Sequence, residues 1–416
     1  MTCDTVHVEN QTENNVTHAQ APEPATNLDT FAVITTSGPD KPGVSAAFFR
    51  VLSSHNIELV DVEQAIFSGR ISLAAYVRLD SARLEQLEQG LRNTLSIYNQ
   101  VISLDIKADE TTSRARSTHS VVILGESVTA RTMSAVAQEL ANFDANIDRI
   151  RGLSTYPLMG FELFISLQGS GDPVRSALAQ LSKELGVDIA IERAGLQRRA
   201  KRLVCFDCDS TLITGEVIEM LAAHAGKEAE VAAVTERAMR GELDFEESLR
   251  ERVATLAGLD ASVIDEVAAQ IQLTPGARTT VRTLNRMGYR TAVVSGGFIQ
   301  VLEDLAADLQ LDYVRANTLE IVDGKLTGRV IGKVVDRKAK EEFLREFAAD
   351  SGLRMSQTVA VGDGANDIDM ISAAGLGIAF NAKPALREVA DASVSHPYMD
   401  EILQILGIPA EEVVSE

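Results

Sequence analysis

Two aspartates, Asp207 and Asp209, directly follow the apolar run 203–206 and are the residues of this chain best placed for chemistry. The run, Leu-Val-Cys-Phe, predicts a short buried parallel strand. Ligands bind at the carboxyl ends of such strands in an open α/β sheet, and carboxylates near a core are costly unless they are paired or bind a cation. Taken alone, the segment could also be an Asx-type turn before Ser210 and Thr211.

Three further segments place polar groups where predicted elements begin or end. Two are β-branched strands, at 291–294 and 358–361, and the third is a basic helix start at 337–340. The polar residues are Ser295, Gly296, Lys338, Lys340, Asp363, Asn366 and Asp367. Such groups suit a phosphate and a divalent metal, and four segments of this kind in one chain favour a catalytic site over an isolated turn.

The order of these segments resembles the haloacid dehalogenase superfamily, whose signature is DxDx[TV], then Ser or Thr, then Lys, then GDxxxD. The resemblance covers residues 200 to about 408. Glu216, nine residues after Asp207, and the helical insert at 239–253 are similar to the phosphoserine phosphatases of that superfamily. The resemblance implies a Rossmann-like α/β core at 200–416 with a helical cap at about 214–272. It also implies hydrolysis of O-phospho-L-serine through an aspartyl-phosphate, as the last step of L-serine biosynthesis.

Catalytic roles follow from the same resemblance. It makes Asp207 the nucleophile and Asp209 the general acid and base, so burial and neighbouring carboxylates should raise the pKa of Asp209. Lys340 would offset the developing charge, with Lys338 as the nearby alternative. Mg²⁺ is the implied cofactor, because hard oxygen ligands suit it. Its implied ligands are Asp207, the backbone oxygen of Asp209, Asp363 and, directly or through water, Asp367.

Substrate contacts are also implied residue by residue. Arg252 would clamp the substrate carboxylate in a bidentate fashion, and Glu216 would pair with the ammonium group. The phosphate oxygens would be held by Ser295 and the backbone N–H of Gly296. The remaining implied contacts are Asn366, Lys340, Met239 and Phe245.

The first half of the chain contains two tandem βαββαβ patterns, at 29–108 and 119–195, joined by a polar linker at 109–118. Each resembles an ACT domain, a small amino-acid-binding regulatory module. The first copy has a ligand-loop pattern, formed by Gly38, Asp40, Pro42 and Gly43; the second copy lacks the Pro-Gly. The resemblance implies an amino-acid effector such as L-serine and, by analogy, a homodimer.

Composition limits the classes of function. The chain of 416 residues has a formal charge of −21, which argues against a nucleic-acid partner. No apolar run reaches the roughly 18 residues of a membrane span, and residues 1–28 read as a disordered polar tail rather than a signal peptide. We therefore expect a cytoplasmic enzyme. We interpret the basic junction 197–202 as a solvated linker. Cys205 and Cys208 are either packing residues or a pair that binds a metal or has a redox role.

Two other functions remain open from the residues. The enzyme could be a phosphatase or phosphotransferase for another small phosphate, such as phosphohomoserine. Alternatively, the chain could be an amino-acid sensor whose C-terminal domain no longer catalyses. The intact aspartates and Lys340 favour catalysis.

Overall fold

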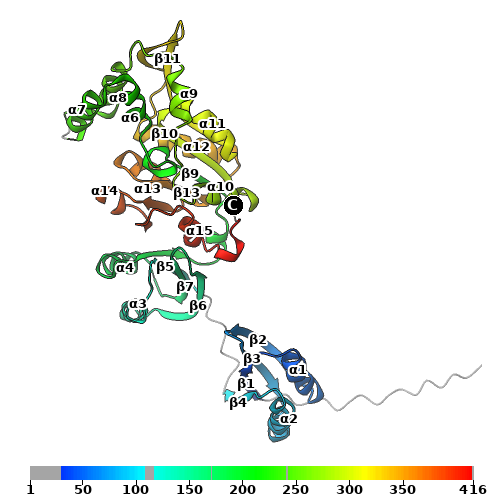
Figure 1. The fold of residues 1–416 in the computed structure, drawn as a ribbon. Helices are drawn as coiled ribbons and strands as arrows, with labels where there is room; N and C mark the ends of the chain where they lie inside the picture. The colour runs from blue at the N-terminus through cyan, green and yellow to red at the C-terminus, as the bar shows by residue number, and fades with distance from the viewer. Residues whose placement is uncertain (1–29, 108–116, 170, 240–241, 415–416) are drawn as a thin grey trace, which may run out of the picture. The chain divides into compact units, whose positions relative to one another are not determined.

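The computed structural model describes residues 30–107, 117–169, 171–239 and 242–414 (Figure 1). The chain divides into two compact units, residues 1–114 and 115–416. The predicted tail at 1–28 and residues 109–116 of the predicted linker lie outside the described residues. Within the described ranges, every helix is too short or too polar to cross a bilayer.

The first unit contains the predicted βαββαβ pattern. Its antiparallel sheet has the strand order β2-β3-β1-β4, and two helices cover one face. The elements are β1 (Thr30–Pro39), α1 (Val44–Ser54), β2 (Glu58–Phe67), β3 (Arg70–Leu79), α2 (Leu84–Ser96) and β4 (Val101–Lys107). Alternate residues of β1, such as Ala32 and Ile34, are fully buried against the helices, as a half-covered sheet requires.

The second βαββαβ pattern has the same topology, with strand order β6-β7-β5-β8. Its elements are β5 (His119–Gly125), α3 (Ala130–Asn142), β6 (Asn146–Ser154), β7 (Met159–Ser166), α4 (Asp172–Leu185) and β8 (Asp188–Arg193). One sheet face packs on α3 and α4. The other face, through Val122 and Leu124, joins the apolar core that contains Ile402 and Leu403 of the C-terminal domain. This domain therefore belongs to the same compact unit as the C-terminal sheet.

The C-terminal sheet has seven strands in the order β12-β11-β10-β9-β13-β14-β15. Only β12 is antiparallel to its neighbour among these described strands. The strands are β9 (Leu203–Phe206), β10 (Arg290–Phe298), β11 (Tyr313–Val322), β12 (Lys325–Ile331), β13 (Thr358–Gly362), β14 (Gly377–Phe380) and β15 (Ala392–Val394). The central strand β9 ends at the predicted site, and the α/β fold class is confirmed.

Helices cover both faces of this sheet. Val204 and Phe206 pack on the side of α10 (Ala277–Arg286), α11 (Ile299–Leu309) and α15 (Glu401–Ile405). Leu203 and Cys205 pack on the other side, against α12 (Arg337–Asp350), α13 (Ile368–Ala373) and α14 (Pro384–Arg387). The two cysteines consequently point into different cores, because Cys208 joins the first and Cys205 the second. Both are buried free thiols, which favours the packing interpretation.

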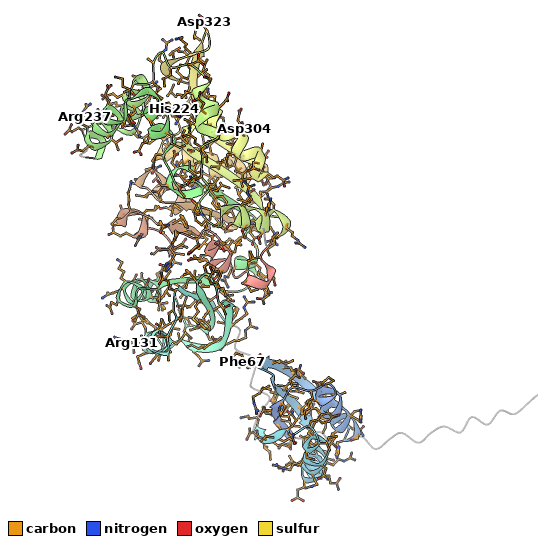
Figure 2. All side chains as sticks on the ribbon, in the orientation of Figure 1. Phe67, Arg131, His224, Arg237, Asp304 and Asp323 are labelled. Carbon is orange, nitrogen blue, oxygen red and sulfur yellow. The ribbon has the colours of Figure 1, made fainter. Side chains whose placement is uncertain are left out.

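The cap contains four helices and, in addition, a β-hairpin. The helices are α6 (Val217–Ala225), α7 (Glu228–Met239), α8 (Phe245–Ala254) and α9 (Val263–Ala268). The β11–β12 hairpin, with Asp323 at its tip (Figure 2), hydrogen-bonds to the segment after α8: Gly258 N donates to Leu326 O at 2.8 Å. The prediction of a purely helical cap was therefore incomplete. Strand β11 is continuous from Tyr313 to Val322 and carries the hairpin out of the core to the cap.

The basic junction is not a solvated linker, and this prediction was wrong. Residues 196–199 form the short helix α5 (Leu196–Arg199), and the side chain of Arg198 is 9% exposed. Arg198 pairs with the fully buried Glu162, and Lys201 is also buried, with its Nζ donating to Gly375 O. Two cations were mistaken for surface residues because their partners, Glu162 and a backbone carbonyl, lie far away in the sequence.

Candidate active site

The end of β9 turns sharply and exposes two carboxylates to one cavity. Asp207 follows the strand, its N–H donating to Val361 O of β13 at 2.8 Å. The chain then makes a tight turn in which Ser210 adopts the left-handed conformation, with φ of 55°. Asp207 Oδ1 accepts the N–H of Cys208 at 2.7 Å, which fixes the carboxylate orientation. The turn thus directs Asp207 and Asp209 toward the cavity at the carboxyl edge of the sheet.

Lys340 lies beneath this edge and connects two of the aspartates. Its Nζ is 2.6 Å from Asp207 Oδ1 and 2.7 Å from Asp367 Oδ1, and the side chain is fully buried. Burial alone would lower the pKa of Lys340, but the two carboxylates outweigh it and raise that pKa. Lys338 instead is exposed and faces Glu342 at 3.9 Å. Of the two lysines proposed from the sequence, Lys340 is the one that reaches the aspartates.

Three carboxylates form a cluster that could hold a metal ion. Asp207, Asp363 and Asp367 each offer one oxygen, and these atoms all lie within 4.8 Å of one another. Asp367 Oδ2 accepts the N–H of Gly364 at 3.0 Å. At Gly362 a Cβ would lie 2.5 Å from Asp367 Cγ, so that position must be glycine for the carboxylate to approach. A set of hard oxygen donors at this spacing fits a divalent cation.

The two aspartates after β9 differ in their surroundings. Burial raises the pKa of Asp209 to about 7, and the carboxylate of Glu216 adds to this effect. Asp209 Oδ1 also accepts the N–H of Val217 at 3.0 Å. Burial and the nearby Asp367 raise the pKa of Asp207 as well, whereas Lys340 opposes them. Asp209 is thus suited to exchange a proton near neutral pH, while Asp207 is held against a cation.

The cap closes a cavity of about 670 Å³ over these groups. Asp244 begins α8 with a capping box: its Oδ1 accepts the N–H of Glu247 at 2.8 Å, and Glu247 Oε2 accepts the N–H of Asp244 at 3.1 Å. Phe245 and Arg252, two turns apart on this helix, both line the cavity. Glu216, at the start of α6, lines it too and accepts the hydroxyl of Ser210 at 2.9 Å.

At the end of β10, two glycines face the cavity, and the serine before them is buried with its hydroxyl oxygen already hydrogen-bonded. Ser295 is fully buried, and its Oγ accepts the N–H of Gly297 at 2.8 Å. Gly296 and Gly297 line the cavity. A Cβ on Gly296 would lie 3.3 Å from the ring of Phe245, so glycine here allows the cap to approach the sheet.

The structure brings most of the predicted residues to this one cavity. Those that line it are Asp207, Asp209, Glu216, Phe245, Arg252, Gly296, Asp363 and Asn366. Asp367 and Lys340 lie directly behind them, and the side chain of Met239 lies outside the described residues. Sequence reasoning missed Arg337 and Lys383, which also line the cavity. Arg337 belongs to the basic helix start that was noticed, whereas Lys383 follows a strand too short to predict.

The predicted regulatory loop lies in the first unit. Gly43 has φ of 99°, and a Cβ on Gly38 would approach Asn99 O to 2.6 Å, so both glycines are required by the local backbone. The N–H of Asp40 donates to Gly69 O at 2.8 Å, while Asp40 and Pro42 remain exposed. At the corresponding place in the second copy, the hydroxyl of Thr129 caps α3 by accepting the N–H of Thr132 at 3.2 Å.

Three segments of the chain match models of known protein families. The haloacid dehalogenase-like hydrolase family model matches residues 201–375, and ACT domain models match 30–101 and 117–192. The chain is 54% identical to phosphoserine phosphatase SerB2 of Mycobacterium tuberculosis over 92% of this chain and 94% of that one. It is 51% identical to the phosphoserine phosphatase of Streptomyces coelicolor, over 90% and 92%. A crystal structure of a probable phosphoserine phosphatase from Vibrio cholerae superposes with a TM-score of 0.56 at 34% identity, covering 73% of this chain and 90% of that one.

Proposed function

Because this chain belongs to the phosphoserine phosphatases of the haloacid dehalogenase superfamily, we propose that it hydrolyses O-phospho-L-serine to L-serine and phosphate, the closing step of serine biosynthesis. One observation carries the proposal: two carboxylates, Asp207 and Asp209, face one cavity, and Asp207 is paired with Lys340 whereas Asp209 lies near the carboxylate of Glu216. Hydrolysis of a phosphate monoester needs a nucleophile and a separate proton donor, and this pair supplies both.

The first step transfers the phosphoryl group to Asp207. A carboxylate oxygen of Asp207 forms a bond to phosphorus as the bond from phosphorus to the serine oxygen breaks. Lys340, 2.6 Å from Asp207 Oδ1, holds the nucleophile in place and offsets negative charge. Asp209, whose pKa is raised to about 7, gives its proton to the departing serine oxygen.

The second step hydrolyses the aspartyl-phosphate. Asp209, now ionised, takes a proton from a water molecule whose oxygen attacks phosphorus, and the bond to Asp207 breaks. Asp209 ends the cycle protonated and Asp207 ends it as a carboxylate. A single residue thus serves both steps, which requires its pKa to lie near the working pH.

Magnesium is the cofactor that we propose for the carboxylate cluster. Asp207 and Asp363 would bind it, together with the backbone oxygen of Asp209, and Asp367 would do so directly or through water. When bound, Mg²⁺ would neutralise phosphate charge and favour the ionised form of Asp207. The support is the cluster of oxygen donors within 4.8 Å of one another.

Substrate recognition is assigned to the cap and to the ends of β10 and β13. Arg252 would bind the substrate carboxylate and Glu216 the ammonium group; both line the cavity. The remaining proposed contacts are Ser295, Gly296, Asn366, Lys340, Phe245 and Met239. In the structure the Ser295 Oγ accepts the N–H of Gly297, so its O–H proton would be the group that donates to the phosphate.

The deciding experiment measures phosphate release from O-phospho-L-serine, with and without Mg²⁺, for wild type and Asp207→Asn. We expect loss of activity without metal and in the variant, and a ³²P-labelled intermediate in acid-quenched wild type alone. Turnover by Asp207→Asn at the wild-type rate would refute the mechanism. Faster release from phosphohomoserine would instead identify another small substrate. The absence of any intermediate or turnover would favour an amino-acid sensor.

Regulation is proposed for the ACT domains, which we assign to residues 29–108 and 119–195. L-serine would bind at the loop formed by Gly38, Asp40, Pro42 and Gly43. Two observations support this proposal. The backbone of the loop requires glycine at positions 38 and 43. A nearby buried oxygen, Gln100 Oε1, has no hydrogen-bond partner within the described residues. Asp40→Ala should abolish the response of activity to L-serine and leave basal activity unchanged. An unaltered response would reject this site.

We also propose that the protein is a cytoplasmic homodimer. The support for self-association is the edge strand β2, where Leu59, Ile66 and Phe67 are 48%, 56% and 82% exposed. Exposed apolar edge strands favour pairing with another chain. Phe67→Glu should shift the molar mass measured by light scattering from two chains toward one, whereas an unchanged mass would exclude this strand from the contact.

A further inference from the structure

A second cavity, of about 350 Å³, lies between the second ACT domain and the phosphatase domain. Figure 1 shows this junction, where α15 lies next to the sheet that contains β5. Five arginines line the cavity: Arg149, Arg151, Arg198, Arg199 and Arg202. Its acidic lining residues are Glu162 and Glu412. The cavity is therefore a cationic site in a chain whose formal charge is −21.

Two of the arginines build the junction itself. Arg151 Nη2 lies 2.5 Å from Glu162 Oε2, and Arg198 pairs with the other oxygen of the same carboxylate. Arg198 Nη2 also donates to Ile405 O at 2.7 Å and Arg151 Nη2 to Gly407 O at 3.1 Å, at the end of α15. Arg151 Nε is buried and lacks an acceptor within the described residues. A donor in that position indicates a group that the protein does not itself provide.

The other three arginines have no carboxylate in ion-pair range within the described part of the chain. The Arg149 guanidinium lies 4.2 Å from the centroid of the Phe164 ring, and that of Arg202 lies 5.5 Å from the Tyr289 ring. Stacking on an aromatic face orients the guanidinium plane of Arg149 and leaves its N–H edge available. Arg202 Nη1 instead donates to Arg199 O at 2.9 Å and to Lys201 O at 2.6 Å. The side chains of Arg149 and Arg199 donate no hydrogen bond to described residues.

We propose that this cavity binds a small phosphate-bearing anion. Guanidinium groups bind phosphate through paired N–H donors, and several of them converge on this cavity. Its volume lies at the small end of ligand pockets, which suits inorganic phosphate or a short phosphomonoester. Such a ligand would bridge arginines of β6 and α5. Because Arg151 and Arg198 also hold the end of α15, its binding would stabilise the contact between the ACT and phosphatase domains.

The test is calorimetric titration of the full chain with inorganic phosphate in the presence of EDTA, at pH 7.5 and constant ionic strength. Without metal, the negative charges of Asp207, Asp363 and Asp367 repel phosphate from the active site. The measured heat of binding therefore reports the arginine-lined cavity. We expect one saturable site per chain. The double variant Arg149→Gln/Arg199→Gln should weaken binding about tenfold or more. Arg345→Gln is the matched control, because Arg345 is exposed on α12 and pairs with Glu341 at 2.7 Å; it should bind as wild type.

A second variant separates loss of the site from damage to the fold. Glu412 lines the cavity and is exposed, so Glu412→Gln should tighten phosphate binding by removing a negative charge. A titration with O-phospho-L-serine identifies which ligand the cavity prefers. If O-phospho-L-serine binds more tightly than inorganic phosphate, the cavity binds the substrate; if it binds more weakly, the cavity binds the product phosphate. Saturating L-serine, which we assign to the loop at Asp40, should leave the affinity for phosphate unchanged. The proposal is overturned if phosphate shows no saturable binding, or if the double variant binds it as wild type does.

Discussion

Lys340 and Asp207 form a buried ion pair, with Nζ 2.6 Å from Oδ1, at the carboxyl end of β9. The same ammonium group is 2.7 Å from Asp367 Oδ1. A buried charge of this kind is stable only with its partners, because each isolated ion would be costly to desolvate. The pair therefore holds Asp207 in position before any substrate arrives.

Replacing Lys340 tests this relationship. Lys340→Met should lower kcat for phosphoserine hydrolysis by about 10²–10³, since a preorganised charge at the reacting group is lost. Lys338→Met is the matched control: this residue is two positions earlier on α12, is exposed and faces Glu342. Its kcat should stay within about twofold of wild type. Equal losses in the two variants would show that the charge of the helix start, and not the pair with Asp207, matters.

The second prediction concerns the proton carried by Asp209. Asp209→Asn should lower kcat on phosphoserine by about 10²–10⁴, the usual contribution of a general acid. Formation of the aspartyl-phosphate from p-nitrophenyl phosphate should fall far less, because nitrophenolate leaves without protonation. The measurement is the pre-steady-state burst of nitrophenol in wild type and variant. A burst rate that falls as much as the rate with phosphoserine would contradict the acid role.

Arg252 offers a test of substrate recognition. Arg252→Ala should raise KM for phosphoserine about tenfold or more, as loss of a charged hydrogen bond does. O-phosphoethanolamine lacks the carboxylate, so its kcat/KM should change little in the same variant. Arg250→Ala is the control, because Arg250 lies on the same helix α8 but pairs with Glu246 at 2.6 Å in solvent. Equal losses on both substrates would place Arg252 at the phosphate instead.

Much of this site could be predicted because its residues follow short strands. Asp207, Ser295 and Asp363 each come directly after a β-branched or apolar run, and parallel strands bring such positions to one edge. Lys340 could be placed on a helix, but the choice between it and Lys338 needed the structure. Helical periodicity gives the face of a side chain only approximately, and just one of the two lysines is buried.

Features that depend on distant partners could not be predicted. Arg198 and Lys201 were predicted to lie in a solvated basic segment. They are buried because Arg198 pairs with Glu162 and Lys201 donates to the carbonyl of Gly375, and both partners are remote in sequence. Lys383 lines the cavity because it follows β14, a strand of only four residues without alternation. The hairpin that completes the cap contacts Gly258, a residue far from it in sequence, and no local pattern reveals such a tertiary contact.

The last prediction concerns Glu401, at the start of α15 where the phosphatase domain meets the second ACT domain. This residue is 1% exposed, and neither carboxylate oxygen has a hydrogen-bond partner within the described residues. Burial raises the pKa of Glu401 from 4.5 to about 8, and the carboxylates of Asp188 and Asp400 add to this. The folded chain therefore keeps a proton that the unfolded chain has lost between these two pH values.

The stability that this proton provides is fully present below pH 4.5 and is lost as the pH rises through about 8. Glu401→Gln removes the ionisable group, so its Tm should exceed that of wild type by a few degrees, roughly 2–4 °C, at pH 9 and match it at low pH. Differential scanning calorimetry from pH 5 to pH 9 measures the difference. Glu411→Gln, at an exposed position near the C-terminus, should show no such trend. A Tm difference that does not change between pH 5 and pH 9 would contradict the prediction. It would mean that Glu401 is ionised in the folded chain over this whole range and that other groups stabilise its charge.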